Sequence, residues 1–385
     1  MLLKKLRPAC IIIIILAGLF SVNTASFASL DNVVGFGDLN GFSNPANTTI
    51  TGKTCLLLDH YQLLSNNVLP AIVFYSDFNG PYFGGSRMDL WTQRNYGLNF
   101  RNDNWGFGYN LVEDGQSVAS GDTARLFQDF KDNSHPVGKI YDIGASGHYN
   151  IKEYMKFCYS MPVETGFAED LRIGTSVNII NGKSYGKATI TGQASVESTT
   201  TTRFDFDINA DHNIRDTHGN GYGLDIGATC RLNDRLTFEM ILENVLGQVY
   251  WQNVRNTEAT GDTQNVIVDG SGNITNNPTI SGTDSTRNIT ERLIFRSLWA
   301  ASYKYEDNLS FLGMIEPYQD LTYYYIGSKW SPSDLYDISF GYGSRYDSVS
   351  VGIEYPFIKL MLFTDNISLS SATSMGILVS GTISE

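Results

Sequence analysis

Residues that could carry acid–base or nucleophilic chemistry are few and scattered along this sequence of 385 residues. Acyl transfer requires a nucleophile and a base in hydrogen-bond contact. The segment Thr217-His218-Gly219-Asn220-Gly221 has a histidine and an asparagine but no serine two residues after the histidine. Ser146 and His148 share a strand face at a spacing that chance easily supplies. We therefore expect no enzyme activity, with a lipid hydrolase as the alternative.

Acidic residues and two histidines gather in one stretch that could hold a cation: Asp205, Asp207, Asp211, His212, Asp216 and His218. Calcium needs several oxygens that converge from one loop, and the residue order of an EF-hand is absent. Gly35-Phe36-Gly37 lacks the strand–loop–helix setting and the lysine of a phosphate-binding loop. We expect neither a metal nor a cofactor, and a solvated acidic loop instead.

The elements that would position these residues are β-strands, because apolar and polar residues alternate along much of the chain. Residues 222–232 carry apolar side chains on one face and polar ones on the other. Residues 236–243 repeat the pattern after the turn residues Asn233-Asp234, so the two segments predict a hairpin. The same alternation recurs in 141–149, 171–179, 204–209, 336–343 and 349–355. The fold class is therefore all-β.

The polar face of these strands decides between two architectures. A soluble sheet favours Lys, Glu and Thr there, whereas this chain has Gly, Ser, Asn and Asp with single charges, which is typical of a barrel lumen. No stretch after Ala28 reaches the roughly 18 to 20 apolar residues of a membrane helix. We predict a transmembrane antiparallel β-barrel over residues 54–385, with roughly 14 strands and a range of about 12 to 16. A secreted soluble β-sandwich is the alternative.

The barrel prediction assigns a set of charged residues to the lumen. They are Arg172, Asp205, Asp207, Asp225, Arg231, Glu239, Glu243, Asp337 and Glu354. Cys230 falls on the opposite, lipid-facing side of its strand. Cys55, Cys158 and Cys230 have no CxxC spacing, so one disulfide with a free thiol and three free thiols are both open. Tyr323-Tyr324-Tyr325 and Tyr250-Trp251 could stack on a sugar or lipid, but we interpret them as membrane-interface belts.

The N-terminus has the three-part layout of a secretory signal peptide. Basic residues at 4–7 precede the apolar run Ile11–Leu16, and Ser26-Phe27-Ala28 supplies small residues for cleavage. We expect residues 1–28 to be removed, with an uncleaved anchor as the alternative. Cys10 precedes the apolar run, so the lipoprotein pattern is absent.

The composition agrees with an exported barrel. Aromatic residues make up 12% of the chain and charged residues 17%, against about 25% charged in ordinary soluble domains. The mean hydropathy of -0.16 is compatible with strands in which only every second side chain faces lipid. The net charge of -13 makes nucleic acid an unsuitable partner and would favour cations in an open lumen.

The connections between the expected strands fall into two lengths. Short turns are predicted at Asn233-Asp234 and Ser344–Ser348, and long loops at Glu113–Val137 and Asn253–Glu291. The second long loop is almost entirely Asn, Thr, Gly, Asp and Ser, which indicates an exposed loop. The first contains residues 123–130, a short amphipathic stretch that we expect to fold as a small helix.

Three segments resemble one group of outer-membrane barrels. Asn44-Pro45-Ala46 follows the glycine-rich residues 35–43, as in FadL-like and TraF-like barrels. The central hairpin, with Gly223-Leu224-Asp225-Ile226-Gly227-Ala228, resembles the TraF-like, conjugal-transfer-related group, and the glycine-punctuated last hundred residues are similar in style. The resemblance implies a monomeric FadL-like barrel with residues 29–53 as an N-terminal plug segment. One departure is the C-terminus, which lacks the terminal aromatic residue of most outer-membrane barrels.

The expected function is that of a channel or passive transporter for small molecules in the outer membrane of a diderm bacterium; the FadL-like resemblance implies hydrophobic cargo, whereas the TraF-like group has no settled cargo. The cargo itself is unknown. Expected partners are outer-membrane lipid and the barrel-assembly machinery, with no nucleic acid. The alternative is a structural barrel of a secretion or transfer apparatus.

Overall fold

The computed structural model describes residues 44–46, 55–66, 87–102, 104–131, 134, 136–198, 201–213, 216–262, 279–318, 321–344, 347–356, 358–367 and 372–384. The predicted signal peptide, at residues 1–28, lies outside these residues, as does the predicted plug segment apart from Asn44, Pro45 and Ala46. Within the described chain, no helix is long and apolar enough to cross a membrane.

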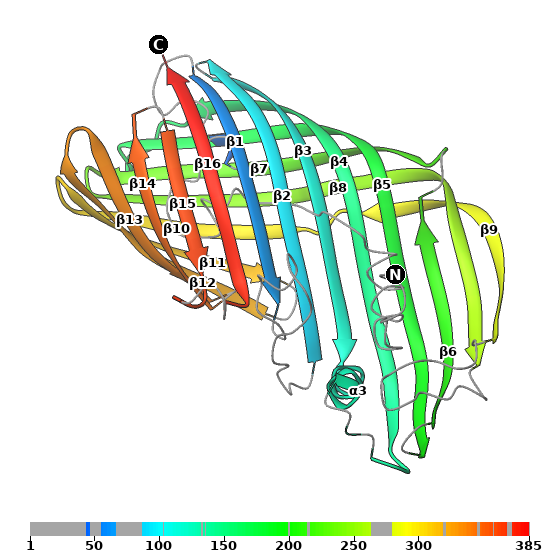
Figure 1. The fold of residues 1–385 in the computed structure, drawn as a ribbon. Helices are drawn as coiled ribbons and strands as arrows, with labels where there is room; N and C mark the ends of the chain where they lie inside the picture. Colours follow the sequence, from blue (N-terminus) through cyan, green and yellow to red (C-terminus); the bar gives the residue numbers. More distant parts are fainter. Residues whose placement is uncertain are drawn as a thin grey trace.

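The described elements are one helix and sixteen antiparallel strands, joined in a single sheet (Figure 1). They are β1 (Cys55–Asn66), β2 (Arg87–Asn102), β3 (Trp105–Ser120), α3 (Gly121–Lys131), β4 (Ile140–Pro162), β5 (Asp170–Ser198), β6 (Thr201–His212), β7 (His218–Asn233), β8 (Leu236–Asp262), β9 (Thr279–Arg292), β10 (Arg296–Glu306), β11 (Leu309–Tyr318), β12 (Leu321–Ser333), β13 (Tyr336–Gly343), β14 (Ser348–Tyr355), β15 (Ile358–Thr364) and β16 (Ser374–Ser384).

Fourteen of these strands form a closed ring, which confirms the predicted antiparallel β-barrel. The ring runs from β1 to β5, then through β7, β8 and β10 to β16, and β16 pairs with β1 from Cys55↔Ser384 to Ser65↔Ser374. Closure pairs the backbone groups of every strand on both sides, which is what a strand-built membrane protein requires. The predicted count of about 14 strands therefore holds for the ring.

The two remaining strands, β6 and β9, extend one side of the barrel beyond the ring. β5 pairs with β7 through residues 170–182 and with β6 through residues 186–198. β8 likewise pairs with β7 and β10 in its first part, and with β6 and β9 in its second. Figure 1 shows the long strands β5 and β8 continuing into this extension, with β6 and β9 beside them.

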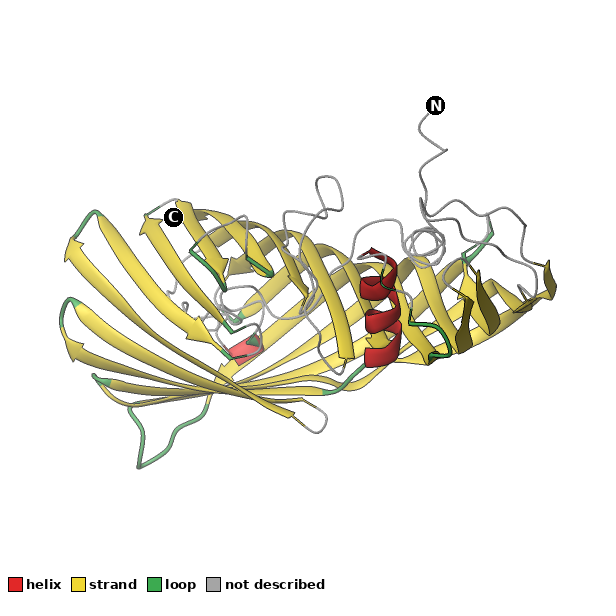
Figure 2. Ribbon diagram, turned by 60° about the horizontal axis from the view of Figure 1, so that its bottom comes forward, coloured by secondary structure: helices red, strands yellow, loops and turns green. Residues whose placement is uncertain are grey.

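The connections have the two lengths that the sequence predicts, but the loop boundaries were wrong. β3 continues to Ser120 before α3 begins, and most of the predicted loop at 253–291 belongs to β8 and β9. The segments of β8 and β9 lie in the extension, where polar side chains on both faces leave no alternation to detect. The small helix predicted at 123–130 is confirmed as α3, which lies beside the wall in Figure 2.

Aromatic residues surround the barrel at the end where the short turns lie. Trp105 contacts Tyr159 with ring centroids 4.7 Å apart, Phe107 contacts Phe157 at 5.2 Å, and Tyr336 contacts Tyr355 at 5.9 Å. Most of these rings are strongly exposed, as in the interfacial girdles of outer-membrane barrels. The ring thus has the outward face of a membrane protein.

Buried and exposed side chains alternate along the ring strands, which separates an inner from an outer face. On β7, Gly223, Asp225 and Gly227 are buried on the inner face, whereas Tyr222 is 51% exposed on the outer face. Cys230 is partly exposed and has the same strand parity as Tyr222, as predicted from alternation.

Candidate functional site

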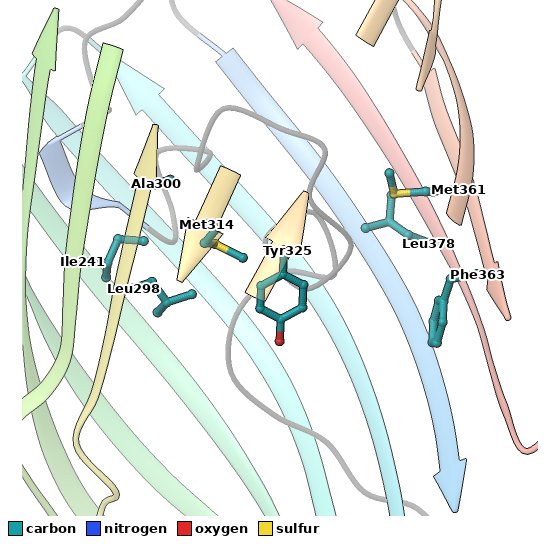
Figure 3. Packing of buried hydrophobic residues seen from close by; sticks show 8 residues of the cluster. All are labelled: Ile241, Leu298, Ala300, Met314, Tyr325, Met361, Phe363 and Leu378. Carbon is teal, nitrogen blue, oxygen red and sulfur yellow. The ribbon is translucent and has the colours of Figure 1, made fainter. Parts of the chain in front are cut away.

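Part of the inner face in the C-terminal half of the ring is apolar. Eight buried residues from six strands form one cluster, which we call the apolar inner wall: Ile241, Leu298, Ala300, Met314, Tyr325, Met361, Phe363 and Leu378 (Figure 3). Their chain neighbours Trp299, Ile315, Tyr324 and Leu362 are 44–54% exposed and face outward. These strands are therefore apolar on both faces, whereas the sequence predicted a uniformly small and polar lumen.

A buried ion cluster borders the apolar inner wall. Arg296 Nη1 lies 3.2 Å from Glu243 Oε2, and Arg296 Nε donates to Glu316 Oε1 at 3.0 Å. Tyr325 donates its hydroxyl to Glu316 at 3.0 Å. All three ionised side chains are under 10% exposed. Buried charges of this kind are tolerated only when they are paired and hydrogen-bonded.

Asp225 is the centre of a second buried polar cluster, at the point where the strand ladder between β7 and β8 is interrupted. Leu224 pairs with Leu246 and Ile226 with Leu242, so β8 carries extra residues opposite Asp225. The Asp225 carboxylate accepts hydrogen bonds from Ser176, Asn178 and the backbone N–H of Asn244, all at 2.9–3.0 Å. Lys156 Nζ lies 2.9 Å from the same carboxylate. Side-chain bonds thus replace the missing ladder contacts.

Asn44, Pro45 and Ala46 lie against the inner face of β5 and β7. The Asn44 amide donates to Ala228 O at 3.2 Å and to Thr229 Oγ1 at 3.1 Å, and lies 3.4 Å from Glu239 Oε2. A Cβ added at Gly174 would overlap the backbone of Pro45 and Ala46, and one at Gly227 would overlap Asn44. These two glycines are cross-strand partners. Glycine is needed at both positions because residues 44–46 approach the barrel wall closely there, with backbone atoms at Gly174 and with side-chain atoms at Gly227.

Trp251 packs against a second pair of glycines. Gly182 on β5 and Gly219 on β7 are cross-strand partners, and the indole of Trp251 covers both. Trp251 is fully buried and its Nε1 donates to Glu291 at 2.8 Å. Glu291 also accepts from Lys152 on β4 at 2.8 Å. Side chains from β4, β8 and β9 therefore meet in front of the wall at this level.

The predicted lumen-facing residues divide into three groups. Asp225, Glu239 and Glu243 are buried in the clusters above. Near the short turns, Arg172 pairs with Asp170, Arg231 with Glu169, and Lys329 with both Asp337 and Glu354. The remaining two, Asp205 and Asp207, are exposed on β6, which does not belong to the ring.

The residues considered for chemistry are not assembled into a reactive set. His148 lies 3.6 Å from Asp114, and His218 contacts the backbone oxygen of Asp216. Among the described residues, no group of three or more His, Cys, Asp or Glu side chains could hold a metal ion. Cys158 and Cys230 carry free thiols.

Sequence reasoning missed the apolar inner wall and misjudged two aromatic residues. Tyr325 and Trp251 are fully buried, so their assignment to interface belts was wrong, whereas Tyr324 and Tyr250 are exposed as expected. The signal for the wall was a loss of alternation. Residues 323–326, 311–315 and 360–363 are almost continuously apolar or aromatic, as strands buried on both faces are.

The comparisons with known proteins identify the fold. No protein-family model matches the sequence, and no curated protein matches it. Among solved structures, a TodX monoaromatic hydrocarbon channel mutant (deltaS2S3) superposes with a TM-score of 0.52 at 12% identity, covering 94% of this chain and 99% of that one. The Ralstonia pickettii toluene transporter TbuX gives 0.51 at 11% identity, covering 94% and 98%. The Pseudomonas putida toluene transporter TodX gives 0.50 at 12% identity, covering 94% and 99%. The chain has the fold of the FadL-type outer-membrane hydrocarbon channels.

Proposed function

We propose that this protein is an outer-membrane channel for small hydrophobic molecules. The apolar inner wall is the observation that carries the proposal. A water-filled porin is lined with polar side chains, whereas this barrel presents Leu298, Met314 and Phe363 toward its interior. Binding sites for apolar ligands are concave and mostly apolar, with a few polar groups for orientation. The fold shared with toluene and hydrocarbon channels supports the same reading.

In this proposal, Asn44, Pro45 and Ala46 are the part of an N-terminal plug that is anchored to the wall. Their contacts with Ala228, Thr229 and two wall glycines support such a role. The segment is held by three side-chain hydrogen bonds from Asn44 and by close packing against Gly174 and Gly227.

The proposed location is the outer membrane, reached by export on the N-terminal signal peptide. The short-turn end would face the periplasm, because both chain termini of the ring lie there. The resemblance of the central hairpin to TraF-like barrels keeps a second candidate, a structural barrel of a transfer apparatus. In that case the apolar inner wall would carry no cargo, and this difference separates the two candidates.

Uptake into proteoliposomes tests the proposal. The purified full chain is reconstituted into vesicles with a lipopolysaccharide outer leaflet, which apolar molecules cross slowly, and the entry of a neutral apolar probe, octanol, is compared with protein-free vesicles of the same composition after correction for partition into lipid. A channel accelerates entry in proportion to the protein content. Equal entry with and without protein would contradict the proposed function.

A further inference from the structure

A band of charged residues crosses the outer face of the barrel above the apolar residues of β2 to β5. Glu113 on β3 pairs with Arg94, its cross-strand partner on β2, with Oε2 and Nη1 3.3 Å apart. Glu153 on β4 pairs with Lys183 on β5 at 3.0 Å and accepts a hydrogen bond from Tyr109 at 3.0 Å. We call Arg94, Glu113, Glu153 and Lys183 the outer charged band. Lys183 is 46% exposed, so the band meets the surroundings of the barrel and not its interior.

The outer charged band lies a short way above the aromatic girdle of the short-turn end. Trp105 belongs to this girdle, and the outward residues of β3 above it are apolar or aromatic up to Leu111. These two residues are six positions apart, which is about 15 Å along the barrel axis at about 3.3 Å per residue and a strand tilt of about 40°. Glu113 is the next outward residue, so the first charge stands about 20 Å above the girdle.

On the far side of the ring, the short hairpin of β13 and β14 ends at a similar height. The two strands have 8 residues each, and residues 344–347 connect them. Tyr355 belongs to the girdle, and the outward face of β14 is apolar from Tyr355 to Val349, again six positions. The next residue on this face is Asp347, whose carboxylate accepts a hydrogen bond from the Tyr342 hydroxyl at 2.8 Å. Charge on β2 to β5 and strand length on β13 and β14 thus give the same short apolar face.

Both of these sides are shorter than the membrane they would cross. The apolar band of an outer-membrane barrel is about 25 Å tall, and a charge on the lipid face costs most at the bilayer midplane and little near the interface. A bilayer accommodates a wall that is too short by becoming thinner beside it. We propose that the membrane is thinned beside β2 to β5 and beside β13 and β14, so that the outer charged band and Asp347 lie in its head-group layer. The inference uses the proposed membrane location but no property of the cargo.

Spin labels on the outward face of β14 measure the thinning directly. Ile353→Cys, Val351→Cys and Val349→Cys are labelled one at a time in a full chain whose four native cysteines are replaced by serine. The labelled chains are reconstituted into dioleoyl-phosphatidylcholine. With the girdle at one interface, a core of about 30 Å places Val349, about 15 Å higher, at its midplane. A thinned core places Val349 near the opposite interface.

The ratio of oxygen accessibility to nickel-chelate accessibility reports the depth of each label. This ratio should be highest at Val351 and several-fold lower at Val349. A ratio that rises from Ile353 through Val351 to Val349 would overturn the inference and leave the channel function standing. Labels that are equally accessible to the nickel chelate at all three positions would overturn the membrane location as well. A heat-dependent shift on SDS gels verifies that each labelled chain is a closed barrel.

The stability of the barrel in bilayers of two thicknesses gives a second test. The unboiled gel band of the wild type should convert to the unfolded band at a temperature several degrees higher in dilauroyl- than in dioleoyl-phosphatidylcholine, because the thinner bilayer needs less deformation. Glu153→Leu combined with Lys183→Leu raises the apolar face of β4 and β5 and should reduce this preference.

The matched control is Arg255→Leu combined with Asp284→Leu, an ion pair between β8 and β9 in the extension. This control should keep the full preference for the thinner bilayer. A wild type that is no more stable in the thinner bilayer would contradict the proposal. So would a folded variant without Glu153 and Lys183 that keeps the preference of the wild type.

Discussion

Gly174 on β5 and Gly227 on β7 face each other across the strand ladder; the backbone of Pro45 and Ala46 lies against Gly174, and the side chains of Asn44 and Pro45 lie against Gly227. Gly182 and Gly219 are a second cross-strand glycine pair on the same two strands, and the indole of Trp251 covers both. Because these four positions have no side chains, the inner face of β5 and β7 has two packing sites. The first packing site, at Gly174 and Gly227, holds residues 44–46, and the second, at Gly182 and Gly219, holds the side chain of Trp251 from β8.

The packing of residues 44–46 against Gly174 predicts how a substitution of this glycine affects transport. Gly174→Ala introduces a Cβ that overlaps Pro45 and Ala46, so the segment must leave the wall. If the segment is a plug, octanol entry into proteoliposomes should rise several-fold. Gly313→Ala is the control, because a Cβ at Gly313 has nothing within 4 Å. Unchanged entry in Gly174→Ala, with entry also unchanged in the control, would contradict the plug.

The packing of Trp251 over Gly182 and Gly219 predicts that its truncation lowers the stability of the barrel. Trp251→Ala empties the space over Gly182 and Gly219 and removes the donor to Glu291. Truncation of a buried tryptophan costs about 3–5 kcal/mol. The temperature at which the unboiled gel band converts to the unfolded band should fall markedly. Trp299→Ala, at a half-exposed outer position, should lower it much less; equal shifts would argue against the packing described.

The Lys156–Asp225 pair predicts an asymmetric response to mutation. Lys156→Met leaves the Asp225 carboxylate buried without its counter-charge, which typically costs about 3–5 kcal/mol. Adding Asp225→Asn to that variant removes the uncompensated charge and should recover part of the loss. Urea unfolding of the wild type, the two single variants and the double variant measures this. A double variant that is as unstable as the sum of both single changes would show that the two side chains do not interact.

Outside the membrane-spanning strands, Asp129 of α3 predicts a pH dependence. Burial raises the pKa of this carboxyl, but hydrogen bonds from Tyr141, Lys139 and Ser134 outweigh it, and the pKa is lowered. The stabilisation is therefore present above the unfolded pKa of about 4 and is lost as the pH falls through the folded value.

Hydrogen exchange in α3 measures the effect, after correction for the intrinsic pH dependence of exchange. Asp129→Asn should speed exchange at pH 7 by a factor that corresponds to less than about 1 kcal/mol, since the pair is partly exposed. Wild type and variant should converge in acid. A difference that persists unchanged into strong acid would assign it to something other than the carboxylate charge.

How far the sequence predicts this fold depends on what each strand faces. Residues 222–232 alternate cleanly because Tyr222 faces outward while Gly223 and Asp225 face inward, and this hairpin was predicted correctly. β9 was missed because Ser281–Ser285 are exposed in the extension, so both faces are polar. Residues 360–363 gave no period because Leu360 and Leu362 face outward while Met361 and Phe363 are buried inside.

The candidate site was only partly predictable for a related reason. Alternation placed Glu239 and Glu243 on the same face, and both are buried there. Arg296, the partner of Glu243, lies more than fifty residues further along the chain, and only the pairing of β8 with β10 brings it opposite Glu243. The packing site for residues 44–46 likewise depends on Gly174 and Gly227, which become neighbours only when β5 pairs with β7.

Photolabelling tests the central claim, that a hydrophobic molecule travels along the apolar inner wall. A neutral alkyl diazirine is added to the reconstituted chain with and without excess octanol, and labelled peptides are mapped by mass spectrometry. The account predicts labels on Met314, Tyr325 and Met361 that octanol suppresses, beside labels on the outward residues Ile315 and Tyr324 that octanol leaves unchanged. Labelling confined to the outward residues, with the inner wall untouched, would contradict it.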